Sequence, residues 1–120
     1  MQKNQSERKE IIKKIYDAAE KYKHHLVIVE GKKDREALQK LGFDNIVLLN
    51  KPLYEVAESV SEKDVVLLTD LDKKGREIYS KLKKGLDKRG VTVDDTLRNL
   101  LFKTELRQIE GLTSYLKKFD

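Results

Sequence analysis

The sequence predicts an α/β protein with a mostly parallel four-stranded sheet, strand order 2-1-3-4, and helices on both faces. Short apolar segments alternate along the chain with segments whose apolar residues recur at helical spacing. This alternation implies crossover connections between parallel strands. Two of the apolar segments end in acidic residues, and ligands bind beyond the carboxyl ends of strands in such sheets. The order 2-1-3-4 is the simplest one that brings these two ends together.

The first half of the chain contains two predicted strands between helices. Isoleucines at helical spacing predict a helix over residues 5–23. Residues 24–31 predict a buried strand, because a continuous apolar run ends there in an acid and a glycine. A helix over 33–41 is stopped by a glycine, a second strand follows at 45–49, and a short helix over 53–60 begins after a proline.

The second half repeats the alternation. Residues 65–69 form the third predicted strand, and leucines on one stripe predict a helix over 73–88 that a glycine ends. A short fourth strand is expected at 91–93, followed by helical segments around 97–102 and 112–119.

Composition indicates one cytoplasmic domain. The 120 residues suffice for one core, so we expect a single domain over residues 1–120. Within it, a core at about 24–95 lies between an N-terminal helix (about 5–23) and C-terminal helices (about 96–119). No apolar run is long enough to cross a bilayer, and the polar N-terminus does not resemble a secretory signal. Without cysteine, the chain cannot form disulfides, thiolate metal sites or a cysteine nucleophile.

The third predicted strand ends in a pair of acids, Asp70 and Asp72. Alternation along a strand would point both side chains the same way. Two carboxylates that close repel each other unless a proton or a cation lies between them. The first predicted strand ends in Glu30, so neighbouring strands bring three carboxylates to one edge. The sequence therefore predicts a divalent-metal site there.

Phosphodiester chemistry suits such a site. Mg²⁺ prefers oxygen ligands and is typically held by one or two carboxylates plus substrate phosphate; Mn²⁺ is a possible substitute. Held by Asp70 and Asp72, it would stabilise charge on a phosphodiester, while Glu30 moves a proton as the catalytic residue. We expect Gly31 to allow a sharp turn and leave room for a phosphate. We expect Gly75 to have a similar role in the first turn of its helix. Ordinary turn chemistry explains both glycines as well.

Basic residues gather around the acids. The segment 73–90 contains eight bases and two acids, a net charge of +6 against +5 for the whole chain. Such a charge indicates a polyanionic partner, although a solvated helix face explains it as well. The residues that follow the two acidic strand ends are the candidate phosphate contacts: Lys32, Lys33, Lys73, Lys74 and Arg76.

Other families with an Asp-x-Asp pair explain less. An EF-hand needs Asp or Asn at its fifth position and Glu at its twelfth, where this chain has Lys74 and Lys81. Haloacid-dehalogenase-type phosphatases carry the pair on the first strand, not the third. A response-regulator receiver has two acids after strand one and one after strand three, the reverse of the pattern here. None of these accounts for Glu30 together with the pair.

Two motifs together resemble the Toprim domain. They are Val-Ile-Val-Glu30-Gly-Lys-Lys-Asp34 and, 40 residues after Glu30, Leu-Thr-Asp70-Leu-Asp72-Lys-Lys-Gly75. That domain is shared by bacterial primases, type IA and type II topoisomerases, overcoming-lysogenisation-type nucleases and recombination-repair proteins. The Arg76-Glu-Ile that follows looks most like small Toprim proteins related to the nuclease that matures 5S ribosomal RNA.

The resemblance implies a Rossmann-like Toprim fold, Glu30 as general acid/base or metal ligand, and Mg²⁺ at Asp70 and Asp72. Asp34 lies in the first turn of a helix, where we expect a capping role before a catalytic one. Glu110 precedes the last predicted helix and either joins the metal shell or starts that helix; we favour the second.

Two functions remain open from the sequence. The first is a Mg²⁺-dependent nuclease or phosphodiester transferase acting on structured RNA or DNA. The alternative is a non-catalytic nucleic-acid-binding module in an RNA-processing or ribosomal assembly, since the chain carries little besides the core.

Overall fold

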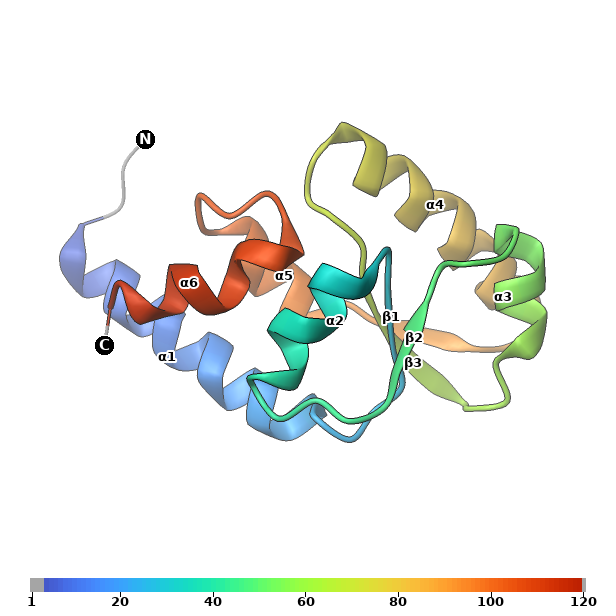
Figure 1. Cartoon of the computed structure of the whole chain (residues 1–120), viewed down its shortest axis with the longest axis horizontal. Coiled ribbons are helices and arrows are strands. Elements are labelled where there is room, and N and C mark those ends of the chain that lie inside the picture. The colour runs from blue at the N-terminus through green and yellow to red at the C-terminus, as the bar shows by residue number, and fades with distance from the viewer. Residues whose placement is uncertain (1–3, 120) are drawn as a thin grey trace.

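Four parallel strands in the order β2-β1-β3-β4 form the centre of the structure, a computed structural model that describes residues 4–119 (Figure 1). The strands are β1 (Val27–Val29), β2 (Ile46–Leu48), β3 (Asp64–Leu68) and β4 (Thr92–Asp94). Ile28 at the middle of β1 is in register with Val47 of β2 and Leu67 of β3. The predicted fold class and strand order are confirmed.

Helices cover both faces of this sheet (Figure 1). One face packs against α1 (Gln5–Tyr22), α2 (Lys32–Gln39), α5 (Thr96–Phe102) and α6 (Leu112–Lys117). The other packs against α3 (Leu53–Ser59) and α4 (Lys73–Lys88). A single 3₁₀ turn, η1 (Ile109–Gly111), precedes α6.

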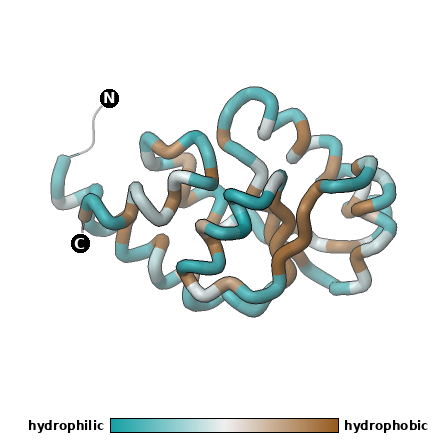
Figure 2. The backbone as a smooth tube through the Cα atoms, viewed as in Figure 1, coloured by the Kyte–Doolittle hydropathy of each residue, from teal (hydrophilic) through white to brown (hydrophobic). Residues whose placement is uncertain are grey.

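The central strands are apolar throughout because both of their faces are covered. Val27 and Val29 of β1 point into the cluster with α1, whereas Ile28 between them points into the cluster with α4. Figure 2 shows the result, with hydrophobic colour concentrated in the strands and hydrophilic colour over much of the helices. Burial on both faces is what parallel sheets require.

β1 and β2 are shorter than the sequence predicts, whereas β3 and β4 have the predicted lengths and are each shifted by one residue. β1 spans three residues where 24–31 was expected, and Glu30 and Gly31 lie in a bend after it. β3 ends at Leu68, so Asp70 and Asp72 lie in the turn that leads into α4. The expected strand alternation therefore does not orient them, and local hydrogen bonds do so instead.

No helix within residues 4–119 combines the length and the apolar character needed to cross a membrane.

Candidate metal and nucleic-acid site

The carboxyl ends of β1 and β3 bring the two acidic motifs into contact. Val29 is in register with Leu68, so the chain leaves both strands at the same edge of the sheet. The backbone N–H of Asp70 then donates a hydrogen bond of 2.7 Å to Oε2 of Glu30. Residues 40 positions apart in sequence thus form one site.

Four carboxylates border an open cleft of about 500 Å³ at this edge, which we call the acid cleft. Its lining consists of Glu30, Gly31, Lys32, Lys33, Asp34, Asp70, Gln108 and Glu110. Because these residues come from the ends of β1 and β3, the start of α2 and η1, the cleft exists only in the folded chain.

Asp34 is the most buried of these acids, with 7% of its surface exposed. Its Oδ2 accepts a hydrogen bond of 3.0 Å from the backbone N–H of Gly31. Through this contact Asp34 caps the N-terminus of α2, as the sequence predicts. Burial, followed by the charges of Asp70, Glu30 and Glu110, raises the pKa of Asp34 to about 6. The charge on Asp34 is therefore poorly compensated by the protein.

Asp70 is held from the C-terminal part of the chain. Its Oδ1 accepts a hydrogen bond of 2.9 Å from the backbone N–H of Ile109 in η1. Burial, with smaller contributions from the negative charges of Asp72 and Glu110, raises the pKa of Asp70. A cation at this position would relieve that repulsion.

Asp72 lies at the N-terminus of α4. Its Oδ1 accepts a hydrogen bond of 2.8 Å from the backbone N–H of Gly75 and caps the helix. It lines a second hollow of about 680 Å³ instead of the acid cleft. We call this hollow the α6 groove; it is lined by Arg8, Asp72, Glu105, Leu106, Arg107, Gln108, Glu110, Gly111, Ser114, Tyr115, Lys118 and Phe119. Asp72 and Glu30 thus line different hollows, and Glu110 lines both.

The two glycines of the motifs differ in what they do. A Cβ on Gly75 would lie 2.0 Å from the carbonyl oxygen of Asp70, so only glycine lets α4 start this close to the acidic turn. Thr69 completes the contact, its Oγ1 donating a hydrogen bond of 2.7 Å to the Gly75 carbonyl. Gly31, in contrast, lies in the bend after β1 but has extended backbone angles that any residue adopts, so this bend does not require a glycine. A Cβ on Gly31 would meet open space, because it faces the cleft.

Arg98 of α5 is a site residue whose role does not follow from the sequence. Its side chain is buried, and it donates hydrogen bonds to the carbonyl oxygens of Thr69 (2.6 Å) and Asp70 (3.2 Å). The guanidinium stacks on the rings of Tyr79, at 4.4 Å, and Phe102, at 5.2 Å. Burial lowers the pKa of Arg98. The only available signal was a lone arginine among the buried leucines of α5.

The candidate phosphate contacts fall into two groups. Lys32 and Lys33 are exposed and border the acid cleft. Lys73 and Arg76 border a separate hollow on the outer face of α4, together with Lys81. Lys74 is exposed on the first turn of the same helix. The structure therefore does not gather all five bases at one rim.

Two residues of the C-terminal segment complete the cleft. Glu110 lies in η1, immediately before α6, so its predicted place at the start of the last helix is correct. The same turn also brings Glu110 and the neighbouring Gln108 to the acid cleft. Gln108 carried no sequence signal, because its position depends on a backbone contact: the N–H of Leu71, in the turn after β3, donates a hydrogen bond of 2.8 Å to the carbonyl oxygen of Arg107.

The acids present suit Mg²⁺ by their chemistry. Among residues 4–119, no three acidic or histidine side chains form a ready-made metal cage. Mg²⁺ does not need one, since it keeps several waters and takes one or two carboxylates plus phosphate. The hydrogen bonds described above use one oxygen each of Glu30, Asp70 and Asp72, and a carboxylate has a second oxygen with which to bind.

Comparisons with known proteins agree with this geometry. The family model of the Toprim domain matches residues 25–96. A "UPF0292 protein" from Methanocaldococcus jannaschii is 36% identical over 100 residues, covering 77% of this chain and 78% of its own. Another from Pyrococcus horikoshii is 43% identical over 98 residues, covering 76% and 74%.

A solved structure has a similar fold. The protein, from Aquifex aeolicus, superimposes with a TM-score of 0.70 at 34% sequence identity, covering 92% of this chain and 99% of the Aquifex chain. The similarity therefore extends beyond residues 25–96 to helices at the ends of the chain.

Proposed function

The chain belongs to the Toprim domain family, as its two motifs indicated, and from that premise we propose that it is a Mg²⁺-dependent nuclease acting on structured RNA or DNA. The observation that carries this proposal is the contact between Glu30 and the backbone of Asp70 in a cleft that two lysines border. A proton-transferring acid, a candidate metal ligand and candidate phosphate contacts thereby meet at one place.

Asp70 and Asp72 would hold the metal, with Glu30 as a further ligand or as the proton-transfer group. When bound, Mg²⁺ would neutralise the mutual repulsion of these carboxylates and stabilise charge on the phosphodiester; Mn²⁺ would serve similarly. Glu110 borders both hollows and is available to hold a metal-bound water.

The contacts of Glu30 support a role in proton transfer. The hydrogen bond from Asp70 fixes Oε2 and leaves Oε1 as the basic atom. In hydrolysis a water oxygen forms a bond to phosphorus, the bond to the leaving oxygen breaks, and Glu30 accepts the water proton or supplies one to the leaving oxygen. Lys32 and Lys33 bind phosphates next to the reacting one, which sets the register of the strand.

Cleavage of structured RNA and DNA by the purified protein with Mg²⁺ tests this function. Asp70→Asn should abolish the Mg²⁺-dependent activity, and Glu30→Gln should lower it by about 100-fold or more, the usual value of general acid–base catalysis. Asp64→Asn is the matched control, because Asp64 is exposed at the opposite end of β3. Equal activity in the wild type and Asp70→Asn would refute the proposal.

A non-catalytic binding module is the second candidate, and the basic surface of α4 favours it. Lys73, Arg76 and Lys81 border a hollow outside the acid cleft. Binding alone predicts salt-sensitive affinity, with log K falling by about 0.9 per neutralised phosphate on duplex DNA for each decade of salt. Turnover that Glu30→Gln removes would exclude this candidate.

A further inference from the structure

We propose that the α6 groove binds single-stranded nucleotides next to the cleaved phosphodiester, with bases stacked on Tyr115 and Phe119. This inference rests on the proposed function and names the form of its substrate: a strand whose bases are unpaired beyond the reacting phosphate.

The groove continues from the acid cleft. Gln108 and Glu110 line both hollows, and Asp72 of the acidic turn lines the groove as well. Lys118 and Phe119 line it just beyond the C-terminal end of α6. The groove therefore follows the six residues of α6, about 9 Å at 1.5 Å per residue. That length accommodates about two nucleotides at the roughly 3.4 Å spacing of stacked bases.

Two aromatic side chains form its wall. Tyr115 and Phe119 are one helical turn apart, with ring centroids 5.2 Å from each other and planes inclined at 58°. Both are half-buried and line the groove, so each is supported from behind by the core. Rings held in this way are platforms on which any base can stack.

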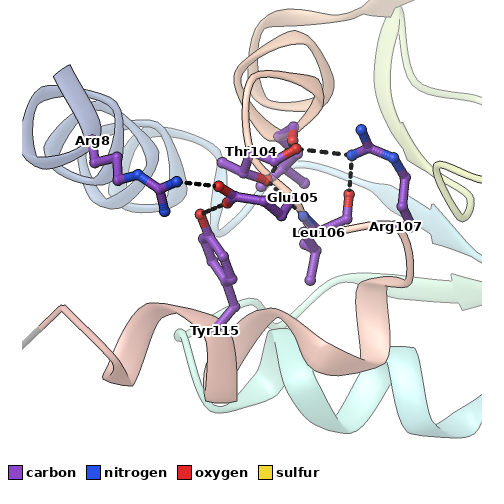
Figure 3. A network of polar contacts seen from close by, with 7 residues as sticks. Arg8, Thr104, Glu105, Leu106, Arg107 and Tyr115 are labelled. Atoms are coloured by element: carbon purple, nitrogen blue, oxygen red, sulfur yellow. Dashed lines mark hydrogen bonds and ion pairs between the residues drawn. The ribbon is translucent and has the colours of Figure 1, made fainter. Parts of the chain in front are cut away.

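Polar contacts fix the Tyr115 ring before a ligand binds. Its hydroxyl donates a hydrogen bond of 2.7 Å to Oε2 of Glu105, whose Oε1 pairs at 2.7 Å with Arg8 from α1 (Figure 3). A preordered ring loses little conformational entropy on binding, which favours affinity.

Two cations, Arg107 and Lys118, line the groove together with the rings and are available to the phosphates of a stacked strand. Arg107 donates hydrogen bonds from Nη1 to the carbonyl oxygens of Thr104 (2.8 Å) and Leu106 (2.6 Å), which anchors its guanidinium at the groove (Figure 3). Lys118 places its Nζ over the Tyr115 ring, 5.9 Å from the ring centroid, at the end of a flexible side chain that a base could displace. Aromatic rings interleaved with cations are typical of surfaces that bind single strands.

Unpaired nucleotides fit this groove better than a duplex does. In a duplex the base faces are covered by their neighbours, so the rings would have nothing to stack on. An unpaired strand leaving the acid cleft exposes them, as in most sequence-tolerant recognition of single strands.

Fluorescence anisotropy with labelled oligonucleotides tests the inference in EDTA, so that no cleavage occurs. Tyr115→Leu removes one stacking platform and should weaken binding of single strands by about tenfold, which corresponds to about 1.4 kcal/mol. Tyr115→Phe keeps the ring and should keep most of the affinity. Tyr54→Leu is the control, because Tyr54 is 65% exposed on α3, which packs on the other face of the sheet.

Duplex ligands and a second variant complete the experiment. Duplex binding should change by less than about twofold in Tyr115→Leu, in RNA and DNA alike, since stacking does not read the sugar. Equal losses for duplex and single strand, or wild-type binding of single strands by Tyr115→Leu, would overturn the inference. If Tyr115→Leu has a lower melting temperature than the wild type, Phe119→Leu is measured instead. A similar loss of single-strand affinity in Phe119→Leu would support the inference, and unchanged affinity would reject it. This experiment measures binding and not cleavage. If the protein binds single strands through Tyr115 but never cleaves them, the proposed nuclease activity is refuted and the proposed binding groove is not.

Discussion

A methyl group added to Gly75 would lie 2.0 Å from the carbonyl oxygen of Asp70, far inside van der Waals contact. Gly75→Ala should therefore displace the acidic turn or the start of α4 and lower the free energy of unfolding by about 3 kcal/mol, the upper end of overpacking. Gly85→Ala in the same helix is the matched control. Its Cβ would lie 3.4 Å from that of Ala57, so the better helix former should raise stability by up to about 1 kcal/mol. Urea denaturation of both variants measures the difference, and equal stability would show that the turn adapts freely.

Asp34 gives a prediction for pH. A carboxyl whose pKa rises from 3.8 unfolded to about 6 folded binds its proton more tightly in the folded state. Its contribution to stability is therefore fully present below about pH 4 and is lost as the pH rises to 6. Without metal, Asp34→Asn should remove this loss and be more stable than the wild type at pH 7.5, by on the order of 2 kcal/mol. Melting curves in EDTA at pH 4.5 and 7.5 measure the difference, and a gap that does not grow with pH would contradict the assignment.

The residues of the site differ in how far sequence reveals them. Glu30 and Asp70 could be placed together, because strand order alone brings their strand ends side by side. Arg98 could not be given a role, since its partners are backbone carbonyls of Thr69 and Asp70, and backbone partners leave no sequence pattern. Gly31 has extended backbone angles, and sequence alone does not tell whether a glycine needs the left-handed region.

At the scale of elements, α4 depends on Asp72 as its N-cap. Asp72→Ala should lower the free energy of unfolding by about 1 kcal/mol, the usual effect of losing a cap. Asp72→Asn keeps an oxygen for the N–H of Gly75 and removes a charge that repels Asp70, so without metal it should be slightly more stable than the wild type. Chemical denaturation in EDTA separates the two variants. Identical stabilities would mean that the capping bond contributes nothing.

Elements with strong periodicity were predictable and the turns between them were not. The long helices α1 and α4 follow their apolar stripes, and the four strands occur in the expected order. The missed element is η1, whose three residues are too few to carry a period. The orientation of the acids in the turn after β3 does not follow from strand alternation, because hydrogen bonds from the N–H groups of Gly75 and Ile109 determine it and neither is visible in the local sequence.

At the scale of the whole molecule, the site depends on segments beyond the family match. Residues 25–96 supply Glu30, Asp70 and Asp72. The segment after them contributes Arg98 behind the acidic turn, the N–H of Ile109 on Asp70, and Glu110 at the cleft. The C-terminal helices thus pack on the sheet and also hold the acids in place, which explains why burial and charge together raise the pKa of Asp70.

Metal binding should therefore stabilise the entire fold. Mg²⁺ that binds only the folded chain adds RT ln(1 + [Mg]/Kd), about 1.4 kcal/mol at ten times Kd. For a chain of 120 residues this corresponds to a rise in Tm of roughly 5 °C, and a shallow site of few carboxylates should give no more. Differential scanning fluorimetry with millimolar Mg²⁺ or Mn²⁺, against NaCl of equal ionic strength, measures it. Asp72→Asn keeps the helix cap, so if Mg²⁺ no longer raises its Tm, the cause is lost metal binding and not a damaged α4. The Tm of the control Asp64→Asn should rise with Mg²⁺ as in the wild type. A wild type that ignores Mg²⁺, together with an Asp72→Asn variant less stable in EDTA, would make Asp72 a purely structural cap.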